Sequence, residues 1–377
     1  MTYLLASELG KRGCTCTSAY LHTKQPVASN REVFASEEHL PEGDNSTRLG
    51  HIITANNIDF VIVQGVDALM NRQVVYLRKA VELQQRRPFI LFVFHQMPGY
   101  ELHRMDTGVL VDKLFSKDWQ RSVRQLLMQT LLTFDQSVLL KKLHKKYHVP
   151  YQNADKVVLL SPSYIPDFER FAQGGDQSKY AAIPNMLTFP SVDELPHEKS
   201  HEILMVSRMD EDSKRIKRAL QIWAQLPQDS KQDWRLTIVG DGEDLPYYRE
   251  YVRKHRIANV QFEGQQNPLP YYQRASVFMM TSAFEGWPMT LMEAMQNGCV
   301  PVVFDSFKAV HDIIVDGTDG VIVPDGKDGE YAARLAQLLR EQDRREMMAK
   351  AGLVSCQRFS KERITDRWMD LFNSMQN

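Results

Sequence analysis

Two acids stand on either side of a predicted helix start in the stretch FEGWPMTLMEAMQNG, residues 284–298. Pro288 is suited to the first turn of a helix, because the N–H that proline lacks would have no partner there, and Gly298 is a typical helix stop. The pattern therefore predicts Glu285 in a loop and Glu293 inside the helix. Carboxylates placed in this way can accept hydrogen bonds from the hydroxyl groups of a ligand.

The start of this helix is suited to an anion. The first backbone N–H groups of a helix lack partners and lie at the positive end of its dipole, so they form a candidate phosphate site. Glu293 would lie about 7 Å further along the helix axis, where it can accept both hydroxyls of a ribose. Glu285 would face a second sugar, and the set indicates a nucleotide diphosphate sugar. The other candidate residues are Gly286, Trp287, Met289 and Thr290.

Two cations upstream strengthen this interpretation. In SRMDEDSKR, Arg208 directly follows a strand-like run and Lys214 comes six residues later, where it opens the next predicted helix. A diphosphate leaving group gains negative charge in the transition state and needs such compensation. Two acids separated by seven residues are a common pattern, and a helix cap with a solvent-facing glutamate is the alternative. For Arg208 the alternative is a surface ion pair.

The fold must hold these residues in place, and its class can be predicted from the order of the elements. Strand-like runs alternate with helical segments along the chain. Continuous apolar strands between helices are typical of parallel sheets that are covered on both faces, so the sequence predicts an α/β, doubly wound architecture. The proline-containing stretch 183–202 predicts a linker, with a domain boundary near residue 190. The predicted strands are 60–64, 89–94, 156–161, 202–207, 235–240, 260–264, 277–282 and 300–304.

The beginning of the chain departs from this architecture. Residues 1–20 open on an amphipathic helix followed by a strand, whereas a doubly wound domain begins with a strand whose glycine-containing turn lines the ligand crevice. We therefore expect that another element covers this place or that the first strand and its glycine loop are missing. A truncated chain and a loss of activity are the two explanations of a missing strand.

Composition narrows the class of protein. The 377 residues are 43% hydrophobic and 25% charged with a net charge of −1, which predicts a globular protein of two domains and argues against nucleic acid as the main partner. The apolar runs fall short of the roughly 18 residues that cross a bilayer. The four cysteines show no zinc spacing and no signal peptide precedes them. These features predict a cytoplasmic protein.

Positive charge is concentrated in one stretch. Residues 104–146 hold 9 basic and 4 acidic residues and end in LLKKLHKKYHV. A solvated helix face is one interpretation. The alternative is a patch that contacts anionic lipid headgroups, with Leu139, Leu140 and Leu143 as its apolar neighbours.

The ordered motifs of the second half resemble the retaining family-4 glycosyltransferases, also called glycosyl transferases group 1. The resemblance runs from about residue 200 to the end and extends more weakly over residues 1–190. It rests on VSRMDEDSKR (206–215), LTIVGDGED (236–244), VQFEGQQN (260–267), SAFEGWPMTLMEAMQNGCVPVVF (282–304) and DIIVDGTDGVIVP (312–324).

This resemblance implies the GT-B fold, in which two Rossmann-like doubly wound domains face each other across a cleft. It implies an acceptor-side domain over residues 1–190, apparently without its first strand, and a donor domain over residues 191–359. The last helix, residues 360–377, would cross back onto the first domain with Trp368 as its anchor.

The resemblance also implies roles for the candidate residues. Arg208 and Lys214 would bind the diphosphate, Glu293 the ribose and Glu285 the donor sugar. The nucleotide-binding candidates also include Phe262 and Glu263, which would border the base, and Gly240, for which a structural turn is the alternative.

One candidate lies in the first half of the chain. His95 follows the strand 89–94, and the family often has a histidine near the donor sugar in this region. It would hydrogen-bond the sugar or stabilise positive charge, and a structural hydrogen bond is the alternative. Gly99, Tyr100 and Glu101 are predicted to shape the acceptor side. Neither Glu285 nor Glu293 is assigned as a general base.

The predicted function is the transfer of a hexose-type sugar from a nucleotide sugar, with UDP suggested by the family, to a glycan or lipid-linked glycan acceptor in surface polysaccharide biosynthesis. The sugar would keep its anomeric configuration, and no metal cofactor is expected. Two alternatives are a catalytically impaired nucleotide-sugar-binding partner subunit and a GT-B epimerase or phosphorylase. Peripheral contact with an anionic membrane through residues 104–146 is also expected.

Overall fold

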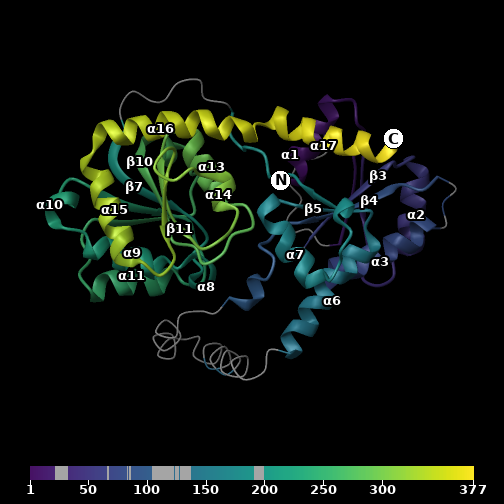
Figure 1. The fold of residues 1–377 in the computed structure, drawn as a ribbon, viewed down its shortest axis with the longest axis horizontal. Coiled ribbons are helices and arrows are strands. Elements are labelled where there is room, and N and C mark those ends of the chain that lie inside the picture. The colour runs from purple at the N-terminus through teal and green to yellow at the C-terminus, as the bar shows by residue number, and fades with distance from the viewer. Residues whose placement is uncertain are drawn as a thin grey trace. The chain divides into compact units, whose positions relative to one another are not determined.

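The chain folds into two compact units (Figure 1). A computed structural model describes residues 1–21, 33–65, 68–82, 84, 86–103, 123, 127, 137–190 and 199–377. The first unit comprises the described residues of Met1–Gly99, Ser137–Met186 and Phe359–Asn377, and the second comprises those of Tyr100–Gln136 and Leu187–Arg358. By these bounds the chain passes between the units at residues 99–100, 136–137, 186–187 and 358–359.

The first unit is built on a parallel sheet with the strand order β3-β4-β5-β6. Its strands are β3 (Phe60–Gln64), β4 (Phe89–Phe94), β5 (Lys156–Leu159) and β6 (Tyr180–Ala182). In β4 the residues from Ile90 to Phe94 are 0–2% exposed, as expected for a strand covered on both faces. The helices are α1 (Thr2–Lys11), α2 (Ser46–Ala55), α3 (Ala68–Glu82), α6 (Ser137–Asn153) and α7 (Ile165–Ala172), with the 3₁₀ turns η2 (Pro162–Tyr164) and η3 (Gln177–Lys179). The 3₁₀ turn η1 (Tyr100–Leu102) belongs to the second unit.

Two further strands of this unit, β1 (Thr17–Tyr20) and β2 (Ser36–His39), form a separate parallel pair. In a Rossmann domain the order is 3-2-1-4-5-6, so the first strand joins the second strand to the fourth. In that order β1 and β2 correspond to strands 2 and 3, and β3 corresponds to strand 4. Strand 1, which would join the two sheets, would then lie between β1 and β3. No joining strand occurs among the described residues, which agrees with the departure predicted at the start of the chain.

The second unit has a complete Rossmann order. Its parallel six-stranded sheet runs β12-β11-β10-β7-β8-β9, which is the 3-2-1-4-5-6 order read from β9. The strands are β7 (Ser200–Val206), β8 (Arg235–Val239), β9 (Val260–Gly264), β10 (Ala275–Met280), β11 (Val300–Asp305) and β12 (Val321–Pro324). The order reverses between β7 and β10, which are paired neighbours at the centre of the sheet.

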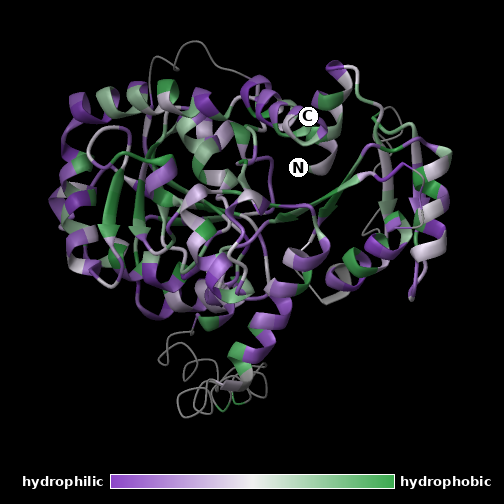
Figure 2. Cartoon of the chain, turned by 45° about the vertical axis from the view of Figure 1, so that its right-hand side comes forward, coloured by the Kyte–Doolittle hydropathy of each residue, from purple (hydrophilic) through white to green (hydrophobic). Residues whose placement is uncertain are grey.

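Helices cover both faces of this sheet (Figure 1). They are α8 (Glu211–Lys214), α9 (Ile216–Gln225), α10 (Gln228–Lys231), α11 (Leu245–Lys254), α12 (Leu269–Arg274), α13 (Met289–Gln296), α14 (Val310–Ile313), α15 (Asp328–Arg340) and α16 (Gln342–Cys356). Helix α9 buries Ile216, Ala219, Leu220 and Trp223, a spacing that forms one apolar stripe. Figure 2 shows the result, with hydrophobic strands inside and helices of alternating hydropathy around them.

The end of the chain belongs to the first unit. After the turn η4 (Gln357–Phe359), helix α17 (Lys361–Gln376) packs beside α1, and the Phe372 ring stacks on Phe60 at 4.4 Å between centroids. Trp368 of this helix is buried, at 4% exposed. Within the described ranges, no helix has the length and apolar character that a membrane span requires.

Candidate functional site

The candidate site of the second unit is formed by loops at the carboxyl ends of β7 and β10. In doubly wound sheets, ligands bind where the strand order reverses, because the loops diverge there and leave a crevice. A small cavity lies at this point, and its polar lining comes from both loops and from α13. The polar lining residues are Ser207, Lys214, Thr281, Ser282, Glu285 and Thr290.

Lys214 and Glu285 contact each other directly in this cavity. The Lys214 Nζ atom lies 2.6 Å from Glu285 Oε1, and the side chains are 21% and 12% exposed. Ser282 Oγ donates to the same carboxylate oxygen at 2.7 Å. The structure thus brings together the predicted phosphate cation and the predicted sugar-binding acid. An ammonium group has three N–H donors, so Lys214 can bind a phosphate and keep this ion pair.

The backbone fixes Lys214 in an unusual way. The sequence predicted that Lys214 opens a helix, but it ends the short helix α8, and Arg215 then adopts a left-handed conformation with φ 50° and ψ 46°. The prediction was wrong because a left-handed arginine leaves no signal in an apolar pattern. The Thr281 hydroxyl donates to the carbonyl oxygens of Lys214 and Arg215, each at 3.0 Å. In addition, Ala283 N–H donates to Ser213 O. These bonds tie the loop after β10 to the end of α8.

Arg208 is exposed and paired. Its side chain is 70% exposed and donates to Asp210 at 2.9 Å. Burial alone would raise the pKa of Asp210, but hydrogen bonds from Ser213 and the charge of Arg208 hold the pKa below its ordinary value. The surface ion pair that was the alternative for Arg208 is therefore present. Exposed pairs of this kind contribute little stability, so Arg208 can exchange Asp210 for a phosphate at small cost.

Glu293 lies in the second turn of α13, and both of its carboxylate oxygens are occupied. Thr188 Oγ1 donates to Oε1 at 2.6 Å, and the Tyr272 hydroxyl donates to Oε2 at 3.0 Å. Pro288 precedes the helix as its N-cap instead of forming its first turn, and its carbonyl accepts from Leu291 N–H at 3.1 Å. The small shift follows from the extended ψ of Pro288, 95°, which keeps it outside the helix.

The glycines of VGDGED allow two loops to touch. A Cβ atom on Gly240, at φ 135°, would lie 1.9 Å from the carbonyl oxygen of Ser207, and one on Gly242 would lie 2.5 Å from that of Met209. Only glycine permits this approach. Gly240 therefore has a structural role in shaping the site, which was the alternative given for it.

The remaining nucleotide candidates differ in their surroundings. Trp287 is 6% exposed, and its indole N–H points to the Met292 sulfur, so the ring is part of the packing beneath the loop. Glu263 accepts from the Tyr271 hydroxyl at 3.1 Å. Phe262 packs against the core of the unit. Gly286 is buried and Thr290 is partly exposed.

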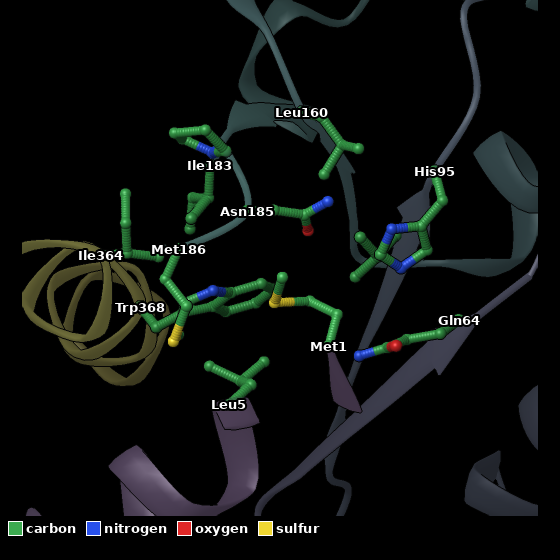
Figure 3. Close-up of a pocket in the computed structure, with 12 residues that line it drawn as sticks. Met1, Leu5, Gln64, His95, Leu160, Ile183, Asn185, Met186, Ile364 and Trp368 are labelled. Carbon is green, nitrogen blue, oxygen red and sulfur yellow. The ribbon is translucent and has the colours of Figure 1, made fainter. Parts of the chain in front are cut away.

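His95 lies in the first unit, in a pocket of its own (Figure 3). It follows β4, and its Nε2 atom is buried without a hydrogen-bond partner among the described residues. Burial, and secondarily the charge of the Met1 amino group, lowers the pKa of His95 to about 4, so the imidazole is neutral at pH 7. Figure 3 shows Met1, Gln64 and Trp368 among the residues that line the pocket.

Gly99, Tyr100 and Glu101, which were predicted to shape the acceptor side, lie among the residues that the structure describes. Gly99 adopts φ 81° and its N–H donates to the Tyr147 hydroxyl at 2.8 Å in the first unit. Tyr100 and Glu101 lie in η1. The Tyr100 ring packs on Phe284, directly beside Glu285, at 5.5 Å between centroids within the second unit. Most of the basic stretch 104–146 lies outside the described residues.

Sequence reasoning missed four residues that hold the site, namely Thr188, Tyr272, Thr281 and Ser282. Thr188 falls in a segment that reads as a linker. Tyr272 falls in a helical pattern that gives no reason to single it out.

Comparison with known proteins places the second unit in a family. Residues 191–353 match the sequence model of the glycosyl transferases group 1. These residues form a group 1 glycosyltransferase domain. The chain is 30% identical over 183 residues to the amylovoran biosynthesis glycosyltransferase AmsD of Erwinia amylovora, a match that covers 48% of this chain and 50% of AmsD. The chain spans about half the length of the curated relatives it matches.

Solved structures show that the group 1 domain is part of a GT-B fold with two Rossmann-like domains. HepE of Anabaena, solved in complex with UDP, superposes with a TM-score of 0.72 at 15% identity and covers 99% of this chain and 95% of its own. The lipopolysaccharide outer core galactosyltransferase WaaB superposes with a TM-score of 0.68 at 17% identity, over 99% of this chain and 94% of its own. The predicted fold class is confirmed.

Proposed function

We propose that this protein is a glycosyltransferase that moves a hexose-type sugar from a UDP-sugar to a glycan or lipid-linked glycan acceptor, with retention of the anomeric configuration. The proposal rests on the contact between Lys214 and Glu285, which lies where the strand order of the second unit reverses. Support comes from the group 1 domain and from relatives such as AmsD, named for amylovoran biosynthesis, and a lipopolysaccharide 1,6-galactosyltransferase of Salmonella typhimurium.

The proposed chemistry relies on positioning and charge. As the bond between the sugar and the diphosphate breaks, negative charge grows on the leaving phosphate, and Lys214 and Arg208 stabilise it. The acceptor hydroxyl attacks on the face that the diphosphate leaves and gives its proton to the leaving phosphate. Glu285 orients the sugar through its hydroxyls, and Glu293 binds the ribose. Because two protein cations face the diphosphate, we propose that no metal ion takes part.

His95 is proposed to act only as a hydrogen-bonding group. Its low pKa makes it neutral at pH 7, so it can accept or donate one hydrogen bond to a sugar hydroxyl but carries no charge. Its unpartnered Nε2 atom offers one such bond.

A second candidate function is a partner subunit that binds a nucleotide sugar without transferring it. In a complete Rossmann domain the turn after the first strand approaches the diphosphate, and among the described residues no strand joins the β1-β2 pair to the sheet of β3 to β6. A GT-B epimerase, the other alternative, has no comparable structural support.

A contact with anionic membranes through residues 104–146 is part of the proposal for the acceptor. In the described part of this stretch, Lys141, Lys142 and Lys145 of α6 are exposed, and Leu140 beside them is 42% exposed. Flotation with vesicles of phosphatidylglycerol should depend on these three lysines, and binding that survives their replacement by glutamine would contradict the membrane contact.

The transfer activity is tested by incubating the full chain with a panel of UDP- and GDP-sugars and following sugar release by NMR, which also reports the anomer formed first. We expect slow hydrolysis of one donor with retention. Lys214→Ala should reduce the rate by on the order of a hundredfold, because one transition-state contact is lost. Lys350→Ala, at an exposed lysine of α16, is the matched control. Binding of a donor without any sugar release or transfer would favour the partner subunit.

A further inference from the structure

The carboxylate of Glu293 is held in one orientation before any ligand arrives. Thr188 donates to one of its oxygens at 2.6 Å and Tyr272 to the other at 3.0 Å. A carboxylate offers about four acceptor positions, so these two bonds fix its plane and leave positions for a ligand. We propose that Thr188 and Tyr272 are positioning residues that set Glu293 to receive the two hydroxyls of the donor's ribose. This inference rests on the proposed function.

Tyr272 is a rigid donor. It is 0% exposed on α12, and its ring packs against Phe278 and Phe189, each at 6.1 Å between centroids. Burial, together with the nearby charge of Glu293, raises the pKa of Tyr272 well above its ordinary value, so the hydroxyl keeps its proton. The Glu293 carboxylate therefore always meets a donor on this side.

Thr188 is held by the helix that carries Glu293. Gln296, three residues after Glu293 and 0% exposed, donates through Nε2 to the carbonyl oxygens of Phe189 at 3.0 Å and Pro190 at 2.9 Å. These bonds fasten the segment that follows Thr188 to α13. The hydroxyl of Thr188 thus has a fixed position relative to the carboxylate, although the segment has no regular secondary structure.

The value of this arrangement is preorganisation. A free glutamate side chain loses rotational freedom when it binds a ligand, and that loss weakens affinity. Here the two hydroxyls restrict the side chain in advance, so a ribose can bind without ordering it. Thr188 and Tyr272 act through Glu293 and need not touch the ligand.

The experiment measures affinity for a nucleotide with and without ribose hydroxyls. Calorimetric titration of the full chain uses UDP or GDP, whichever wild type binds more tightly, and the matching 2′,3′-dideoxy nucleotide. Tyr272→Phe and Thr188→Val should each weaken binding of the ribonucleotide by roughly fivefold, the effect of one hydrogen bond, and leave the dideoxy nucleotide unchanged. Thr188→Ser, which keeps the hydroxyl, should behave as wild type.

Tyr180→Phe is the matched control. It also removes one tyrosine hydroxyl bond, to Gly174 O at 3.1 Å in the first unit, and should change neither affinity. Equal weakening of both nucleotides by the site variants would show a merely structural role and overturn the inference, as would unchanged affinity for both. In either case the proposed function survives. If wild type binds neither UDP nor GDP, the inference and the proposed function both fail.

Discussion

Among single residues, the ion pair between Lys214 and Glu285 is the contact on which the proposed donor site rests. The pair was not visible in the sequence, because the two residues are 71 positions apart and each was assigned to a different part of the ligand. The residue types and the loop or helix placement of Glu285 and Glu293 could be predicted. Their hydrogen-bond partners could not, since these depend on which loops the fold brings together.

Glu285→Gln should separate nucleotide binding from sugar binding. The change keeps the shape of the side chain but removes its charge, so the positive charge of Lys214 is no longer partly neutralised and attracts the diphosphate more strongly, while the sugar loses a carboxylate acceptor. UDP itself should bind about threefold more tightly, in line with the small energy of such pairs, and turnover of the UDP-sugar should fall. Calorimetry and a donor hydrolysis assay measure the two effects. Weaker binding of UDP by the variant would show that the charge of Glu285 does not oppose binding of the diphosphate.

The stability of the protein should decrease in mild acid because of His95. Its pKa is about 4 in the folded chain against the ordinary 6.5, so the unfolded chain binds the extra proton first. The contribution of His95 to the free energy of unfolding is fully present above pH 6.5 and is lost as the pH falls towards 4. Between pH 7.5 and 5 the free energy of unfolding should therefore decrease by about 2 kcal/mol. Urea unfolding at both pH values should show a loss that is smaller by this amount in His95→Gln than in wild type, because His103, whose pKa burial also lowers to about 4, remains in the variant.

The exposed His51 of α2 supplies the control for this pH dependence. His51→Gln should leave the loss of stability between pH 7.5 and 5 as in wild type. An undiminished loss in His95→Gln would mean that His95 is accessible to protons in the folded protein.

At the scale of elements, the close contact between the loops after β7 and β8 depends on Gly240. Gly240→Ala would place a Cβ atom 1.9 Å from the Ser207 carbonyl oxygen, so we expect a loss of about 3 kcal/mol or more in the free energy of unfolding. Gly326→Ala is the control, since Gly326 also has a positive φ, 86°, but open space around its Cβ position. That change should cost only about 1 kcal/mol. Equal losses in denaturant unfolding would show that the loops can separate freely.

The junction between α8 and α9 depends on the left-handed conformation of Arg215. Its guanidinium also pairs with Asp325, at 3.0 and 3.1 Å. Arg215→Gly should leave stability within about 1 kcal/mol of wild type, because the relief of backbone strain offsets the lost pair. Arg215→Val should cost about 2 kcal/mol and raise the KM for the donor, because a β-branched residue resists this conformation and displaces Lys214. Similar stability and KM in the two variants would contradict a role for the backbone conformation.

The predicted elements differ from the structure where local patterns are weak. The strands 60–64, 89–94 and 260–264 were predicted residue for residue, because their apolar runs are bounded by polar residues. The boundaries of α8 and α13 were wrong by a few residues. Both errors lie at the candidate site, where the backbone leaves regular structure to present polar groups.

At the scale of the whole molecule, the architecture followed from the alternation of strands and helices, and the ordered motifs identified the family. The second unit has the full Rossmann strand order, and Lys214 and Glu285 meet where this order reverses. The first unit has its strands in two sheets, which agrees with the irregular start of the sequence. The sugar and the acceptor could not be predicted from the sequence, because single side chains in loops decide them.

Titration calorimetry of the full chain with UDP-glucose, UDP-galactose and UDP tests whether the second unit binds the diphosphate and ribose of a nucleotide sugar, as we propose. We predict binding of UDP by the wild-type chain, weakened about tenfold or more by Lys214→Ala because a charged contact is lost. Glu293→Gln should weaken it as well, and Lys350→Ala should not. If UDP and the UDP-sugars do not bind, or if Lys214→Ala and Glu293→Gln leave the affinity for UDP unchanged, the second unit does not bind a nucleotide sugar in the proposed way.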